Sequence, residues 1–255
     1  MRSFGFLTAL SILGLALSGC GNGNSNSYQG WAEGDFVFVG PDEAGRVEKL
    51  AVREGDTVKP GDVLFTVDAE LQEADLKVAE AVLANSRQAF ERAQQLLKTG
   101  SGSQKTYDEA QSNLREAEAR LNAARTRLVR RQLTSPVGGV VQQIYYRPGE
   151  VVPAARAAIS VLPPGNIKIR FFVPQAVLPT IAIDDPVSVR CDGCTADIAA
   201  TITFIAGSAE YTPPVIYSLE ERQKLVFLVE ARPETASGLR VGQPVSVTLK
   251  PREGR

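Results

Sequence analysis

The 255-residue sequence predicts an elongated fold of mixed α and β structure. An antiparallel coiled-coil helical hairpin is expected inside a split β-domain, and a small β-barrel is expected after it. Three observations lead to this prediction. Residues 69–132 carry two heptad-spaced apolar runs, two related glycine-containing β-segments bracket them, and residues 165–250 alternate in short apolar strands separated by turns.

The first 19 residues are typical of a secretory signal peptide. Arg2 precedes an apolar run from Phe4 to Leu17, which is too short for a comfortable transmembrane helix. The next residues, Leu17-Ser18-Gly19-Cys20, resemble the bacterial lipobox, and this resemblance implies cleavage before Cys20 and lipidation of its thiol. An ordinary signal peptide with an incidental cysteine is the alternative. Because a Gly/Ser/Asn tract follows, residues 20–34 are expected to form a flexible lipidated tether.

Two helices are expected over residues 69–132. The seam of large residues is Leu76, Leu83, Phe90 and Leu97 in the first arm and Tyr107, Leu114, Leu121 and Leu128 in the second. Small residues lie three places after most of them, which favours close helix packing. Between the arms, residues 98–103 read Lys-Thr-Gly-Ser-Gly-Ser, a sequence that ends one helix and caps the next. Each arm would be about 40 Å long at about 1.5 Å per residue.

An internal repeat brackets this hairpin. Residues 45–58 and 139–152 superpose without gaps at an offset of 94 residues, and the match continues to 64–67 against 158–161. One copy is too small to bury a core alone, whereas two copies packed face to face can do so. The sequence therefore predicts one β-domain split into residues 35–68 and 133–164.

The repeated pattern of valines and glycines resembles the half-motif of biotinyl and lipoyl domains. Two such halves around a helical hairpin, in a secreted lipoprotein, resemble the periplasmic membrane fusion (adaptor) proteins of the HlyD type, which serve tripartite exporters. The chain lacks the Asp-Lys-Ala and Met-Lys-Met sequences of true carrier domains, so no lipoyl or biotinyl cofactor is expected. An acyl-carrier or transferase module remains a separate hypothesis, which a modified lysine would support.

The resemblance implies a non-enzymatic link between an inner-membrane exporter and a TolC-like outer-membrane channel. Residues 210–226 are similar to adaptors that work with ABC-type exporters. Self-association into a ring or tube is implied, with a hexamer as the candidate. The location implied is the periplasm, with the lipid anchor assigned by the architecture to the inner membrane.

At the end of the hairpin, Arg92, Leu96 and Ser103 match the tip motif of adaptors that dock onto TolC-like channels. Arg92 and Leu96 share a helix face because they lie four residues apart. Ser103 begins the returning helix beside them. The alternative is that the arginine is a solvated surface residue, the leucine packs at the end of the coiled coil and the serine is only the N-cap of the second helix.

Cys191 and Cys194 flank Asp192-Gly193, a dipeptide that favours a tight turn. A local disulfide is the favoured interpretation for an oxidising compartment. A thiol redox site and a metal site are the alternatives. A periplasmic carrier or metal-binding protein that uses this cysteine pair is therefore the second functional hypothesis.

The composition excludes several classes of function. The chain has no histidine, and its only methionine is Met1, so the commonest metal ligand and general base are missing. No metal site and no catalytic residue are predicted. The net charge of −1 gives no support to nucleic-acid binding. The arginines at 125, 127, 130 and 131 are interpreted as cations favoured by the dipole at the end of the second helix.

Overall fold

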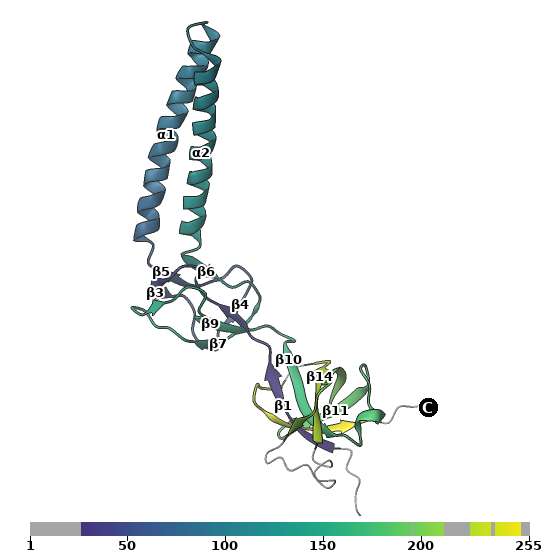
Figure 1. Ribbon diagram of the computed structural model, residues 1–255. Coiled ribbons are helices and arrows are strands. Elements are labelled where there is room, and N and C mark those ends of the chain that lie inside the picture. Colours follow the sequence, from purple (N-terminus) through teal and green to yellow (C-terminus); the bar gives the residue numbers. More distant parts are fainter. Residues whose placement is uncertain (1–26, 195, 212–224, 236–237, 251–255) are drawn as a thin grey trace, which may run out of the picture. The chain divides into compact units, whose positions relative to one another are not determined.

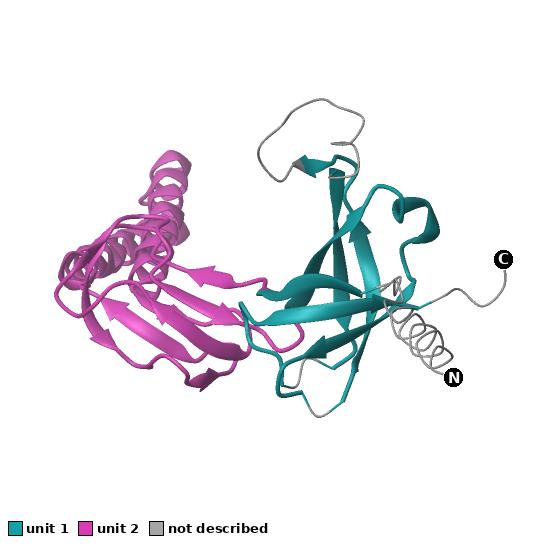
Figure 2. Ribbon diagram, turned by 90° about the horizontal axis from the view of Figure 1, so that it is seen from below, with its two compact units in different colours: residues 1–33, 167–255 teal, residues 34–166 magenta. Residues whose placement is uncertain are grey.

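The structure, a computed structural model, describes residues 27–194, 196–211, 225–235 and 238–250. The chain divides into two compact units (Figures 1 and 2). One unit is formed by residues 34–166, and the other joins the N-terminal residues through Glu33 to the segment from Ile167 onward. The predicted signal peptide and Cys20 lie outside the described residues.

The first unit contains the split β-domain. Its strands before the hairpin are β2 (Val37–Val39), β3 (Gly45–Leu50), β4 (Thr57–Val58) and β5 (Val63–Val67). Those after it are β6 (Gln132–Thr134), β7 (Gly139–Ile144), β8 (Val151–Val152) and β9 (Ile159–Leu162). They form two four-stranded sheets in the orders β2-β9-β7-β4 and β6-β5-β3-β8. Each sheet therefore combines strands from both halves, so neither half is a folding unit by itself.

The two halves are related by an internal two-fold symmetry. Gly45 pairs with Val152, and Gly139 pairs with Val58, which is the same contact with the halves exchanged. The backbone hydrogen bonds follow the same rule, since Gly55 N donates to Val141 O and Gly149 N donates to Val47 O, both at 2.8 Å. The gapless sequence repeat thus corresponds to a structural duplication.

The duplication extends further toward the N-terminus than the sequence predicts. Val39 of β2 pairs with Ile159, and Leu133 of β6 pairs with Phe65, so the 94-residue offset already holds at these outer strands. Residues 39–41 and 133–135 share little beyond one apolar residue at the first position. Sequence comparison therefore missed this part because backbone pairing, and not side-chain identity, carries the symmetry.

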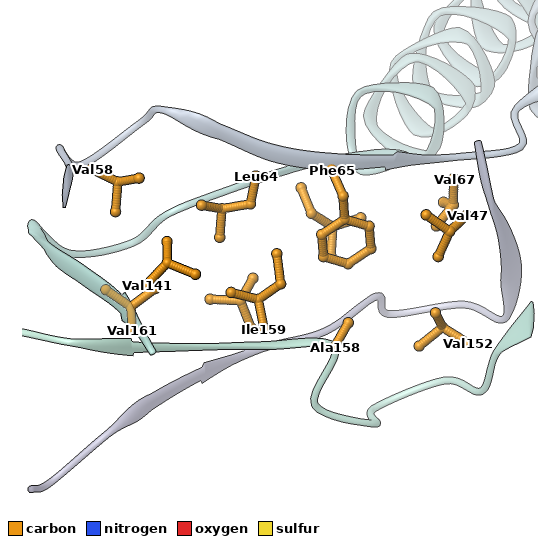
Figure 3. Packing of buried hydrophobic residues seen from close by; sticks show 12 residues of the cluster. Val47, Val58, Leu64, Phe65, Val67, Val141, Val152, Ala158, Ile159 and Val161 are labelled. Atoms are coloured by element: carbon orange, nitrogen blue, oxygen red, sulfur yellow. The ribbon is translucent and has the colours of Figure 1, made fainter. Parts of the chain in front are cut away.

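The core of the split domain lies between the two sheets (Figure 3). Equivalent residues of the two halves are buried together, as in Phe65 with Ile159 and Val47 with Val141. β3 and β7 contribute alternate residues to this core, which is the pattern of a sheet with one buried face, whereas β5 and β9 also bury consecutive residues. Burial of apolar area between the halves is the main term that closes the domain around the inserted hairpin.

Four turn positions of the split domain have a left-handed backbone: Gly55, Gly61, Gly149 and Ala155. Gly55 and Gly149 occupy equivalent turns with φ of 91° and 95°, and Ala155 has φ of 55° at the place where the first half has Gly61. We expect Gly55→Ala and Gly149→Ala each to lower the free energy of unfolding by about 1 kcal/mol. Ala155→Gly should leave it unchanged or raise it by up to about 1 kcal/mol. Denaturant titration of the three variants tests this, and equal effects at all three positions would contradict it.

The hairpin consists of α1 (Glu70–Lys98) and α2 (Gln104–Val129), close to the predicted range. Its seam is the predicted one: Ala93, Ala110, Ala117, Leu121 and Ala124 are buried along it. Phe90 of α1 packs on Tyr107 of α2 with ring centroids 5.4 Å apart. At about 1.5 Å per residue, the 29 residues of α1 reach about 43 Å.

The second unit is a closed six-stranded barrel. Its strands are β1 (Ser27–Gly34), β10 (Ile167–Pro174), β11 (Pro186–Cys191), β12 (Ile198–Ile205), β14 (Leu225–Pro233) and β15 (Pro244–Leu249). The order is β10-β1-β15-β11-β12-β14, and pairing of β14 with β10 closes the circle. The short β13 (Glu210–Tyr211) adds to β14, and one 3₁₀ turn, η1 (Leu178–Thr180), lies between β10 and β11. The predicted small barrel is thus present, with a short helical turn at 178–180.

One boundary prediction is wrong. Residues 27–34 are expected to belong to a flexible tether, but they form β1, which pairs with β15 and with β10. Two of the β1 residues that face inward are small: a Cβ on Gly30 would lie 2.4 Å from the Arg170 carbonyl oxygen, and Ala32 is fully buried. Small inward residues give no apolar alternation, so this strand resembles a linker in the sequence.

Candidate functional site

The distal end of the hairpin carries the predicted tip residues. Arg92 and Leu96 lie one turn apart on α1, and both are exposed; Leu96 keeps 49% of its surface accessible. Within the part of the chain that the structure describes, no ion pair links Arg92 to another residue. The Arg92 guanidinium and the Leu96 side chain are therefore available to a partner.

The loop after α1 folds back onto Leu96. The backbone nitrogens of Ser101 and Gly102 both donate to the Leu96 carbonyl oxygen at 2.9 Å. A Cβ on Gly102 would lie 3.0 Å from the Leu96 Cβ, so glycine allows this close approach. The loop thereby holds the start of α2 against the last turn of α1.

Ser103 has a local role at the tip. Its Oγ accepts a hydrogen bond from the Thr106 backbone nitrogen at 3.1 Å, as an N-cap does, and lies 2.9 Å from the Thr106 hydroxyl. The hydroxyl is therefore engaged in capping α2. Of the three predicted tip residues, Arg92 and Leu96 have exposed side chains, and Ser103 caps the helix that follows the tip loop.

Sequence reasoning missed an exposed line of apolar residues on α1. We call it the α1 apolar stripe: Leu71, Val78, Val82, Ala89 and Leu96. The spacings of 7, 4, 7 and 7 residues place all five within about 20° of one line along the helix, at about 100° per residue. Leu71 and Val78 are 68% and 64% exposed. The signal was present in the sequence as a second heptad series beside the seam.

The cysteine pair closes a turn on the barrel. Cys191 and Cys194 form a disulfide with Cα atoms 5.3 Å apart, and Gly193 between them has φ of 85°. The same loop is braced by Arg190, whose Nε lies 2.8 Å from Asp197 Oδ1. Thiolates are the ligands that soft metals need, and the disulfide removes both. Among the described residues, no group of three or more histidine, cysteine or acidic side chains could hold a metal ion.

A charged cluster holds β1 on the barrel surface. The Arg170 Nη1 lies 2.8 Å from Glu33 Oε2, and its Nε lies 3.4 Å from Glu230 Oε1. The hydrogen bond to Glu33 raises the pKa of the Arg170 guanidinium. Arg170 also lies over the Trp31 ring, 5.8 Å from its centroid. These contacts tie the first strand to β10 and explain why it is not a tether.

Comparisons with known proteins give the same architecture. A structure of a MacA–MexA chimeric protein, which contains the Pseudomonas aeruginosa MexA α-hairpin domain, matches with a TM-score of 0.75. It is 21% identical and covers 90% of this chain and 82% of its own. At that identity the match shows the fold.

Two curated relatives match parts of the sequence. The UPF0194 membrane protein in the asrC 5' region of Acidithiobacillus ferridurans is 27% identical over 129 residues, 48% of this chain and 38% of that protein. The multidrug resistance protein MdtN of Escherichia coli K12 is 44% identical over 54 residues, 21% of this chain and 16% of that protein. The chain thus spans less than two fifths of the length of either relative.

The family can be assigned from the split domain. None of the helices among the described residues combines the length and apolar character needed to cross a membrane. The family model described as "RND MFP, barrel-sandwich hybrid domain" matches residues 35–163, which contain both halves of the duplicated domain and the hairpin between them. Since this match covers half of the chain, the chain belongs to that family of membrane fusion proteins.

Proposed function

We propose that this chain is a periplasmic adaptor that links an inner-membrane exporter to a TolC-like outer-membrane channel. The observation that carries the proposal is the hairpin: about 43 Å of coiled coil with an exposed arginine and leucine at its distal end. The split domain mounts this rod, and its core residues do not reach the tip. Reach and a small contact surface are what a link between two membranes requires.

Members of the family are adaptors of efflux systems, and the proposed role of this chain is likewise non-enzymatic. Arg92 and Leu96 offer a positive charge and an apolar side chain, which suit a helical partner with carbonyl or carboxylate acceptors and a shallow groove. Energy for export would come from the inner-membrane partner.

Two indications point to different classes of exporter. The resemblance of residues 210–226 favours an ABC-type exporter, although 212–224 lie outside the described residues. The family model is named for RND exporters instead. We propose an ABC-type partner, and identification of the crosslinked protein decides between the two classes.

We also propose that several copies assemble side by side into a ring or tube, with a hexamer as the candidate. The α1 apolar stripe supports this, because an exposed apolar line along a whole helix favours contact with another helix. Several tip contacts would then act together, so each can be weak while the assembly binds firmly.

The proposed location is the periplasm, with a lipid on Cys20 that anchors the chain to the inner membrane. We expect Cys20→Ala to release the full chain from the membrane fraction, because the variant lacks the thiol that would carry the proposed lipid. Fractionation with immunodetection measures this. Retention of the variant in the membrane fraction at the original level would contradict the anchor.

The docking proposal is tested by photo-crosslinking in cells. A photoreactive amino acid at position 96 should form an adduct with an outer-membrane channel, identified by mass spectrometry. The matched control is Gln88, which is exposed on the same helix two turns below the tip. Adducts to the channel from position 88 and none from position 96 would overturn the docking assignment.

A further inference from the structure

Two arginines at the end of α2 contact the segment that leads into β3. Arg130 Nη1 donates to Asp42 Oδ2 at 2.8 Å. Arg131 Nη1 donates to the backbone oxygen of Ala44 at 3.1 Å, and its Nη2 lies 3.5 Å from Glu43 Oε2. The helix dipole explains why positively charged residues are favoured at this helix end. The contacts go further, because they give each arginine a specific partner 87 or 88 positions away in the sequence.

The Glu43 carboxylate connects both helices. Besides Arg131, it accepts a hydrogen bond at 3.2 Å from Nε2 of Gln72, in the first turn of α1. Gly45 leaves space for this arrangement, since a Cβ there would lie 3.0 Å from Arg131 Nη1. The start of α1 and the end of α2 are therefore both attached to one short segment of the β-domain.

The contacts divide into a closed part and an open part. In the closed part the Arg131 side chain is 11% exposed and Gln72 is 5% exposed, and they meet a Glu43 carboxylate that is 50% exposed; in the open part Arg130 and Asp42 are 64% and 62% exposed. Water and salt compete for an exposed ion pair and much less for a buried one. Gln72 Oε1 and Arg131 Nε are buried without a hydrogen-bond partner among the described residues, so the closed part is not fully satisfied in this arrangement.

Comparison of the symmetry-related positions associates these charges with the attachment of the hairpin and not with packing of the sheets. The symmetry-related positions, 94 residues away in each case, are all apolar: Pro136 for Asp42, Val137 for Glu43, Phe36 for Arg130 and Val37 for Arg131. Packing of the two sheets therefore does not require charge there. Both sides of each ionic contact therefore depart from the symmetry together, at the place where the helices leave the domain.

We propose that Arg130 and Arg131 are positioning residues that set the direction in which the hairpin leaves the split domain. Arg131, Glu43 and Gln72 form the closed part of an ionic joint, and Arg130 with Asp42 forms a part that salt or the charge of a partner opens. The joint thereby sets the direction in which the tip of the hairpin points. Its effect on docking rests on the proposed function, whereas the direction of the hairpin can be measured without any partner.

The test is a distance measurement between two spin labels on the full chain. A ketone-bearing amino acid replaces residue 98 at the tip and residue 142 on β7, both exposed, and each ketone is then labelled. The unaltered chain should give a single peak in the electron–electron distance distribution. Arg131→Gln should cause loss of that single peak, while circular dichroism shows an unchanged helix content. At about 1 M salt, where the Debye length is about 3 Å, the open part should weaken and the peak of the unaltered chain should broaden.

The matched control is Arg127→Gln. Arg127 lines the same cavity of about 160 Å³ as the two arginines, but no ion pair links it to another residue that the structure describes. This variant should keep the single peak, and the charge exchange Asp42→Arg with Arg130→Asp should keep it at low salt. A single peak in Arg131→Gln, or its loss in Arg127→Gln, would overturn the proposal. Because no channel or exporter is present, failure of docking leaves this result unaffected.

Discussion

Arg92→Asp should reduce the amount of outer-membrane channel that copurifies with this chain roughly 30-fold. Loss of an arginine at the centre of a contact costs about 2 kcal/mol, and each 1.4 kcal/mol changes an equilibrium tenfold. The introduced carboxylate would add repulsion against acceptors on the partner. Folding should not change, because the Arg92 side chain is exposed and makes no ion pair within the described residues. Quantitative mass spectrometry of the crosslinked, purified complex gives the measurement.

The control for this experiment is Arg87→Asp. Arg87 lies on the same helix, is also exposed, and lies more than one turn further from the tip. It has the same charge change without a place in the tip. Equal loss of the channel in both variants would assign the effect to net charge, and an unchanged yield in Arg92→Asp would reject the tip as the docking site.

Phe65→Ala should have the largest effect on stability, about 3–5 kcal/mol. Phe65 is fully buried and belongs to the largest side chains of the core between the two sheets. Its removal leaves a cavity that strands from both halves line, and the halves cannot close it independently because every sheet contains both. Amide hydrogen exchange in β7 and β9, far in sequence from the substitution, reports the loss.

Phe38→Ala provides the comparison, since Phe38 is exposed on β2 of the same domain. Its effect should stay within about 0.5 kcal/mol. If Phe65→Ala also stays within that range, burial of this core is not what stabilises the split domain, and the proposed shared core of the two halves is contradicted.

Much of the fold could be predicted because its signals are periodic. The seam of the hairpin repeats every seven residues. The duplicated halves keep one offset without a gap, with residues 45–67 matching residues 139–161. The turns at Gly55 and Gly149 demand glycine, so they align the copies. The family resemblance then follows from the order of these parts, which the family match to residues 35–163 supports.

The parts that escaped prediction depend on contacts between distant residues. Small inward residues in β1 hide its place in the barrel, where β10 and β15 supply the apolar area. The ionic joint at the root links Arg130 to Asp42, 88 positions away, and the helix dipole already gives a sufficient local reason for an arginine there. Ser103 shows the opposite case, because its capping role is local and the sequence already offered it as an alternative.

The most direct test of the adaptor proposal is the composition of the complex that this chain forms in the cell. The full chain would be crosslinked in intact cells, purified through an affinity tag and analysed by mass spectrometry. We expect one inner-membrane exporter and one outer-membrane channel to be recovered together with multiple copies of the chain. Recovery of the chain alone, or with partners from neither membrane, would contradict it.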